Sequence, residues 1–128
     1  MKRMARIKAM QILYTMDFNQ MDIDTAIAFS MEEEQDELAI TLARTCEANL
    51  EKIDDIIRQA LEHYTIDRLN LVDKAIIRLA ISEMLGKEPR EVIINEALEI
   101  TKLYSDQGDH KATSFNNRLL DNINKMLK

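Results

Sequence analysis

Turn-forming residues are almost absent from this chain, which has two glycines and one proline among its 128 residues. β-Hairpins and Gly-rich phosphate loops both need glycine, because most other residues avoid positive φ angles. Hydrophobic residues make up 46% of the chain and aromatic residues only 5%, and Leu, Ile, Ala, Met, Glu and Lys are abundant. This balance is typical of helices. We therefore predict an all-α protein, and we expect residues 1–128 to form a single domain, since the length is that of one domain.

The spacing of apolar residues predicts about seven helices. Apolar residues recur every three or four positions, which places them on one face of a helix. The segment 67–85 is apolar on more than one face, so we expect it to be the central helix. Ser30 and Glu33 have the spacing of a capping box, while Gly86 and Pro89 are helix stop and start signals. The expected helices are residues 3–18, 24–29, 38–64 with one break near 48–50, 67–85, a segment that begins at Pro89 and a segment from about Ser114.

Positive charge is concentrated at the start of the chain. Residues 1–8 contain four cations and no acid, whereas the other 120 residues, with 13 bases and 23 acids, carry a net charge of −10. We call these four cations the basic arm: Lys2, Arg3, Arg6 and Lys8. Cations near a helix N-terminus oppose the helix dipole, which suggests either a functional use such as phosphate contact or a merely solvated terminus. Gln11 and Tyr14 follow one and two turns along, where they could contact or stack on bases.

Catalytic and metal-binding signatures are missing from the sequence. His63 and His110 lack the partners of the His-Glu-x-x-His and Glu-x-x-His motifs, and there is no P-loop or dinucleotide fingerprint. The one cysteine, Cys46, excludes an internal disulfide and a Cys-cluster zinc site and fits a cytoplasmic protein. No apolar run suits a signal peptide or a membrane span. We therefore expect a cytoplasmic protein that is not an enzyme, holds no metal or cofactor and binds no membrane.

Four segments, in the same order along the chain, resemble motifs of one known family. They read ARIKAMQILY at 5–14, VDKAIIRLAISEM at 72–84, VIINEALEITK at 92–102 and FNNRLLD at 115–121. The first is similar to the Ala-Arg-x-x-Ala-x-Gln-x-Leu-Tyr opening of the bacterial transcription antitermination factor NusB family. The third resembles the Val-x-Ile-Asn-Glu-Ala segment of that family, and the last resembles its Phe-Val-Asn-Gly-Val-Leu-Asp ending. Two residues depart from this ending, because Asn116 stands for the family's Val and Arg118 for its Gly.

The resemblance implies both a fold and a function. The implied NusB-like fold is all-α, with its helices in two small packed bundles, and the implied activity is non-enzymatic and needs no cofactor. The implied partner is NusE, which is a small-subunit ribosomal protein. Together the two proteins would bind single-stranded boxA RNA and join an antitermination complex with RNA polymerase, chiefly in ribosomal RNA operons. Whether the free protein forms a homodimer stays open.

The resemblance also implies site residues. The family's arginine-rich arm falls on Arg3 and Arg6, and its RNA-contacting Lys-Phe pair falls loosely on Lys111 and Phe115. The family's acidic residue that faces NusE falls on Asp73, which we also expect to cap the central helix. The predicted RNA-binding residues are Lys2, Arg3, Arg6, Gln11, Lys111 and Phe115. The predicted partner contacts are Tyr14 and Asp73.

Two other interpretations of the sequence remain. One is a helical adaptor that binds only protein, in which the basic arm is incidental. The other is a metalloenzyme, which rests only on Glu96 and Glu99 at i and i+3, although an exposed acidic face is the simpler reading of that pair.

If Arg3 and Arg6 lie off the apolar stripe of the first helix, their replacement by Glu should leave the stability nearly unchanged.

Overall fold

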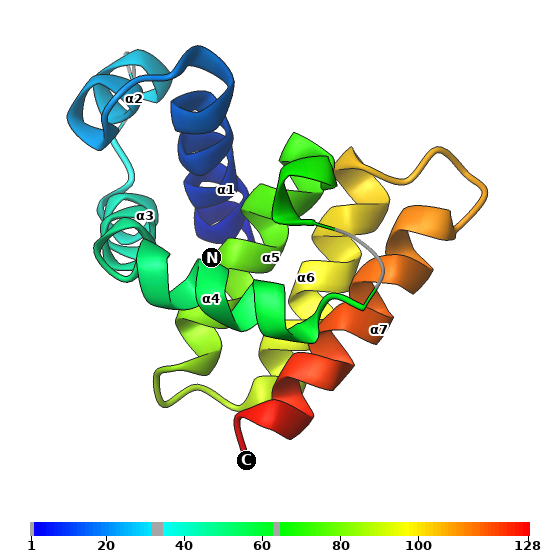
Figure 1. Cartoon of the computed structure of the whole chain (residues 1–128). Coiled ribbons are helices and arrows are strands. Elements are labelled where there is room, and N and C mark those ends of the chain that lie inside the picture. Colours follow the sequence, from blue (N-terminus) through cyan, green and yellow to red (C-terminus); the bar gives the residue numbers. More distant parts are fainter. Residues whose placement is uncertain (1, 32–34, 63–64) are drawn as a thin grey trace.

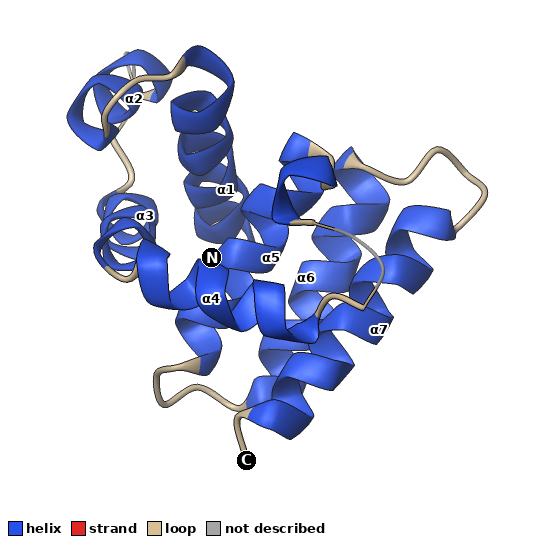
Figure 2. Cartoon of the chain, in the orientation of Figure 1, coloured by secondary structure: helices blue, strands red, loops and turns tan. Residues whose placement is uncertain are grey.

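The computed structural model describes residues 2–31, 35–62 and 65–128, whose course is shown in Figure 1. These residues form seven α-helices, one 3₁₀ turn and no β-strand (Figure 2), which confirms the predicted fold class. In chain order the elements are α1 (Lys2–Asn19), α2 (Ile23–Ser30), α3 (Glu37–Ala48), α4 (Leu50–Ala60), the 3₁₀ turn η1 (Ile66–Arg68), α5 (Leu71–Met84), α6 (Arg90–Tyr104) and α7 (Lys111–Met126).

The helices form two small bundles that share α5. Helices α1, α2 and α3 pack against one another, and α4, α6 and α7 pack around α5. Figure 1 shows the first group in blue and cyan on one side of α5, with α6 and α7 in yellow and red on the other. Because α5 also contacts α1 and α3, it joins the two bundles. The prediction of a central helix is therefore confirmed, and Ile77 and Ile81 within it are fully buried.

Two helix boundaries in the first half of the chain are each stabilised by one polar side chain close to the boundary. Asp22 caps α2, because its carboxylate accepts a hydrogen bond from the Thr25 N–H at 2.8 Å. The predicted break near 48–50 is confirmed, because α3 ends at Ala48 and α4 begins at Leu50. Between them, the Asn49 side chain donates to the Thr45 carbonyl at 2.9 Å, which satisfies one of the last acceptors of α3.

The start of α3 differs from the prediction, because several polar residues that could cap the helix precede it. Ser30 does not open a helix but ends α2, and Glu33 lies outside the described residues. The Asp36 carboxylate caps α3 instead, by accepting from the Ala39 N–H at 3.1 Å. The predicted helix 38–64 ends at Ala60, and residue 64 is outside the described part.

The cap of α5 is Asn70, so the prediction that Asp73 caps this helix is wrong. The Asn70 side chain accepts from the backbone N–H groups of Val72 and Asp73, at 2.8 and 3.3 Å. Residues 67 and 68, which the sequence assigned to the same helix, belong to the turn η1 instead. Asp73 thus lies within the first turn of α5, where its carboxylate is available to other elements.

The polar loop before α7 is organised by Asp106. Its carboxylate accepts from the backbone N–H groups of Gly108 and His110 and from the Thr113 hydroxyl, which is 2.6 Å away. The Thr113 bond, followed by the backbone bonds, lowers the pKa of Asp106 to about 2. Asp109 adds a bond from the Lys111 N–H at 3.1 Å. Because these carboxylates satisfy the first N–H groups, α7 begins at Lys111, three residues before the predicted Ser114.

Candidate nucleic-acid interface

The outer part of the basic arm lies on the first turn of α1 and is held by acidic residues around α6. Lys2 Nζ lies 2.8 Å from Glu88 Oε2, in the loop before α6. Arg3 makes two hydrogen bonds to Glu96 on α6, from Nε at 3.0 Å and from Nη2 at 2.6 Å. The Lys2 and Arg3 side chains nevertheless remain 58% and 47% exposed. These two cations therefore sit at the surface, where a ligand can reach them.

Arg6 is the buried member of the basic arm. Its side chain is only 4% exposed and makes three hydrogen bonds of 2.9 to 3.1 Å to the Glu83 carboxylate on α5. Its Nη atoms also lie 3.1 Å from Glu88 and 3.8 Å from Glu96. Burial alone would lower the pKa of Arg6, but the bonds and charges of Glu83 and Glu88 raise it. The expectation that Arg6 can be reversed to Glu at no cost in stability is therefore wrong, since the side chain joins α1 to α5.

The rest of the predicted α1 site lies further along the helix, and Lys8 points toward the start of α3 instead of α6. Lys8, the fourth cation, lies 3.8 Å from Asp36, which is the limit of an ion pair. Gln11 is exposed. The Tyr14 ring is half-buried and stacks on Phe18, with ring centroids 5.5 Å apart. One face of Tyr14 is thus already covered, while the exposed Phe18 extends the aromatic surface toward the end of α1.

Asp73 is fixed by side chains from two other helices. Its Oδ1 accepts from the Ser105 hydroxyl at 2.6 Å, just after α6, and from Asn116 Nδ2 at 3.1 Å, on α7. Asn116 is fully buried and also donates to Thr101 Oγ1 at 3.1 Å. Within the described residues its Oδ1 accepts no hydrogen bond. Asn116, which stands where the family's motif has Val, therefore connects α7 to the first turn of α5.

Tyr14 and Asp73 lie toward the same end of the α1–α5 pair. Lys74, which follows Asp73, lies 3.1 Å from the Asp17 carboxylate near the end of α1. Asp17 also lies 3.5 Å from Arg78. The two predicted partner contacts are thus on adjoining helix ends, whereas the basic arm lies at the opposite end of α1.

Arg78 is a partly buried cation on α5 whose contacts were not predicted from the sequence. Arg78 makes two hydrogen bonds to the Asp54 carboxylate on α4, at 2.9 and 2.8 Å, and lies 3.5 Å from Asp17 on α1, so it links both bundles. The signal was present, because Lys74 and Arg78 are four positions apart within the most apolar segment of the chain. Cations there need buried acidic partners.

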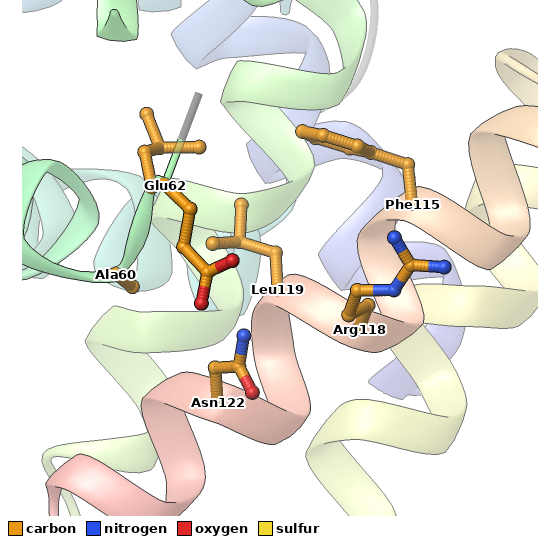
Figure 3. A pocket seen from close by; sticks show the side chains of 7 residues that line it. Ala60, Glu62, Phe115, Arg118, Leu119 and Asn122 are labelled. Atoms are coloured by element: carbon orange, nitrogen blue, oxygen red, sulfur yellow. The ribbon is translucent and has the colours of Figure 1, made fainter. Parts of the chain in front are cut away.

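Phe115 lies on α7, one turn after Lys111, and lines a pocket between the end of α4 and α7. The pocket has a volume of about 220 Å³. In Figure 3 the Phe115 ring lies on one side, with Glu62 across from it and Arg118 and Asn122 along α7. Lys111 is exposed but does not line this pocket. The structure therefore separates the predicted RNA-binding residues into two regions, one on α1 and one on α7.

In the described part of the chain, neither a cluster of metal-ligating side chains nor a membrane-spanning helix is present. No group of three or more His, Cys, Asp or Glu side chains in that part of the chain could hold a metal ion. Glu96, half of the acidic pair considered for a metal, is bound by Arg3. Burial raises the pKa of the Cys46 thiol to about 12, which keeps it neutral and unreactive. Among the helices described, none is long and apolar enough to cross a bilayer.

Comparison with known proteins gives consistent sequence relatives. Residues 3–125 match the profile of the NusB family. The transcription antitermination protein NusB of Listeria innocua is 42% identical over 124 residues, which are 95% of this chain and 94% of that protein. The transcription antitermination protein NusB of Bacillus pumilus is 39% identical over 130 residues, or 99% and 97% of the two chains.

Solved structures share the same fold. T. maritima NusB superimposes with a TM-score of 0.86 at 31% identity, over 98% of this chain and 91% of that one. A chain from the crystal structure of antitermination factors NusB and NusE in complex with dsRNA gives a TM-score of 0.85 at 26% identity, over 98% and 96% of the two chains. The two-bundle arrangement around α5 is thus shared with proteins of that name.

Proposed function

Because the chain belongs to the NusB family, we propose that it acts as a transcription antitermination factor. In this role it pairs with NusE, and the pair binds boxA-type single-stranded RNA and helps RNA polymerase to pass terminators, chiefly in ribosomal RNA operons. The role is non-enzymatic, requires no cofactor and is carried out in the cytoplasm. The observation that carries the proposal is the pair of exposed cations, Lys2 and Arg3, on a protein whose remaining surface is acidic.

The geometry supports an RNA contact along α1. Exposed cations bind phosphates without reading sequence, and sequence is read by groups that reach the bases. Lys2 and Arg3 supply the first kind of contact, and the exposed Gln11 further along α1 supplies the second. Arg6 adds charge from inside the protein rather than direct contact. Lys111 and Phe115 on α7 supply a second region, where an aromatic ring can meet an unstacked base.

Removal of the two exposed cations tests this contact. We expect Lys2→Ala with Arg3→Ala to weaken RNA binding by the NusE pair, and to flatten the slope of log affinity against log salt by at most about 1.4, since each phosphate contributes no more than about 0.7 on a single strand. The measurement is fluorescence anisotropy of a labelled boxA-type RNA over a series of salt concentrations.

The matched control removes the same charge from two other exposed ion pairs. Arg58→Ala with Lys125→Ala removes two cations that are 55% and 70% exposed. Each of them pairs with an acid on its own helix, α4 or α7. This variant should keep the wild-type slope. If the arm variant also keeps it, the RNA site lies elsewhere, and a wild-type pair without any salt-dependent RNA binding would favour the protein-only adaptor.

A second experiment tests the partner contact at Asp73. The carboxylate is held by Ser105 and Asn116 in one orientation at the head of α5, so a basic partner would meet a preorganised negative charge. We expect Asp73→Asn to weaken NusE binding about 30-fold or more, which corresponds to the lower end of the roughly 2–5 kcal/mol lost when an interfacial charge pair is broken. Calorimetric titration of NusE measures the change.

The control for this experiment is the residue that caps α5. Asn70→Ala removes the cap and should cost about 1 kcal/mol of folding free energy while leaving the NusE affinity unchanged. Equal NusE affinity for wild type and a folded Asp73→Asn variant would show that Asp73 serves only to connect α5 with α6 and α7.

A further inference from the structure

We infer that Glu88 and Glu96 occupy the basic arm in place of RNA phosphates, so that RNA binds by exchanging internal ion pairs for external ones. The inference rests on the proposed RNA binding and concerns the same surface. We call these two residues the paired glutamates. Each holds one of the exposed cations, Glu88 at 2.8 Å from Lys2 and Glu96 through two bonds to Arg3.

The chemistry of the two contacts makes carboxylate and phosphate direct competitors. Guanidinium presents a planar fork that binds a carboxylate or a phosphate through two parallel hydrogen bonds. Glu96 uses that fork on Arg3, with Oε1 on Nε and Oε2 on Nη2. A phosphate that binds the same edge must displace the carboxylate. Lys2 carries a compact charge, for which Glu88 and a phosphate compete by proximity.

The exposure of the pairs allows the exchange. Lys2 and Arg3 are about half exposed, so a phosphate can reach both cations, while the Glu88 and Glu96 side chains are 24% and 17% exposed. The hydrogen bonds from Lys2 and Arg3 lower the pKa of Glu88 and of Glu96, so both acids stay charged at neutral pH and remain competitors.

The buried Arg6 limits the exchange to the two outer pairs. Arg6 and Glu83 are 4% and 9% exposed, so their ion pair stays closed and keeps the start of α1 on α5. Arg6 also lies within 3.1 Å of Glu88 and 3.8 Å of Glu96. When an RNA phosphate takes Lys2 or Arg3, each paired glutamate therefore keeps a cation beside it. The exchange can therefore proceed without unfolding the helix start, because the Arg6–Glu83 pair is not opened.

Ion-pair exchange predicts a weaker dependence of RNA affinity on salt, which general repulsion by the acidic surface does not predict. A cation that is already paired with a carboxylate of the protein has no bound anion from solution to release. The carboxylate that RNA displaces attracts cations from solution. Fewer ions are then released in total than for the same phosphates bound by unpaired cations, so the salt slope of the wild type should be shallower than its number of phosphate contacts predicts.

The test neutralises the paired glutamates while it keeps their shape. We expect Glu88→Gln with Glu96→Gln, in the full chain with NusE, to bind a short boxA-type RNA about two- to fivefold more tightly for each pair removed. The salt slope should steepen at the same time. Anisotropy titrations over a salt series give both quantities. Thermal melts check that the variant is folded, which we expect because the Arg6–Glu83 pair is unchanged.

The control neutralises two acids that pair with cations outside the arm. Asp55→Asn with Asp121→Asn removes the same charge from exposed pairs with Arg58 and Lys125. A smaller gain than in the Gln variant, with an unchanged slope, supports the exchange. An equal gain in the control overturns it in favour of general repulsion by the acidic surface. RNA binding that the Gln substitutions leave unchanged overturns the exchange alone, whereas failure of both wild type and variant to bind RNA overturns the proposed function as well.

Discussion

Arg6→Ala is expected to lower the free energy of unfolding by about 3–5 kcal/mol, the range found when one partner of a buried ion pair is removed. The physical reason lies in what remains after the change. Glu83 would keep a carboxylate that is only 9% exposed, without the guanidinium that now donates three hydrogen bonds to it. The cost is therefore mainly that of an uncompensated buried charge rather than that of lost attraction. Urea melts followed by circular dichroism measure the effect.

Two further variants separate this explanation from a general loss of packing. Arg6→Met with Glu83→Gln removes the stranded charge and should recover most of the lost stability. Arg44→Ala breaks an ion pair to Asp24 whose side chains are 49% and 78% exposed, and it should cost less than about 1 kcal/mol. A single Arg6→Ala variant that is as stable as Arg44→Ala would show that Glu83 finds enough water to solvate its charge.

This prediction also decides how the RNA contact is to be tested. Arg6→Glu would bring a further carboxylate to a position now beside Glu83, Glu88 and Glu96, where α1 meets α5. Loss of RNA binding in such a variant would report unfolding as much as loss of a phosphate contact. Substitutions confined to Lys2 and Arg3 keep the fold and address the exposed part of the basic arm alone.

Local patterns in the sequence predicted those parts of the fold that neighbouring residues decide. The 3.6-residue period placed α1 and the central α5, and the break predicted near 48–50 separates α3 from α4. The starts of α5 and α7 were missed because several polar residues precede each helix. Only the folded geometry selects Asn70 in one case and Asp106 with Asp109 in the other.

The candidate site was predicted less completely, because its geometry depends on residues far apart in the chain. Arg6 was placed with the exposed cations, yet its partner Glu83 is 77 positions away and no local pattern connects them. A signal did exist, since Arg6 precedes the buried Met10 and Leu13 at helical spacing. The cap that the sequence assigned to Asp73 belongs to Asn70, and the bond between Asp73 and Asn116 spans 43 positions, which no local pattern indicates.

Ile76→Ala is expected to destabilise the protein by about 2–5 kcal/mol, because the substitution leaves a cavity at the centre of the fold. Ile76 is 2% exposed and lies on α5 between α1 and α6. It shares a narrow crevice with Met10 of α1 and with Ile93 and Ile100 of α6. These neighbours belong to two helices, α1 and α6, so they cannot close around the missing methyl groups without moving one helix. Ile76→Val should cost less, about 0.5–1.5 kcal/mol, because most of the volume remains.

The control for this prediction is an apolar residue on the surface. Val92→Ala on α6 shortens a side chain that is 45% exposed, and it should change the stability by no more than about 0.5 kcal/mol. Because α5 belongs to both bundles, Ile76→Ala should lower the midpoint of one cooperative unfolding transition rather than split it in two. A loss below about 1 kcal/mol would show that the α1–α5–α6 junction collapses easily. In that case the ion pairs of Arg6, rather than the apolar core, would be what holds α1 and the basic arm against α5 and α6.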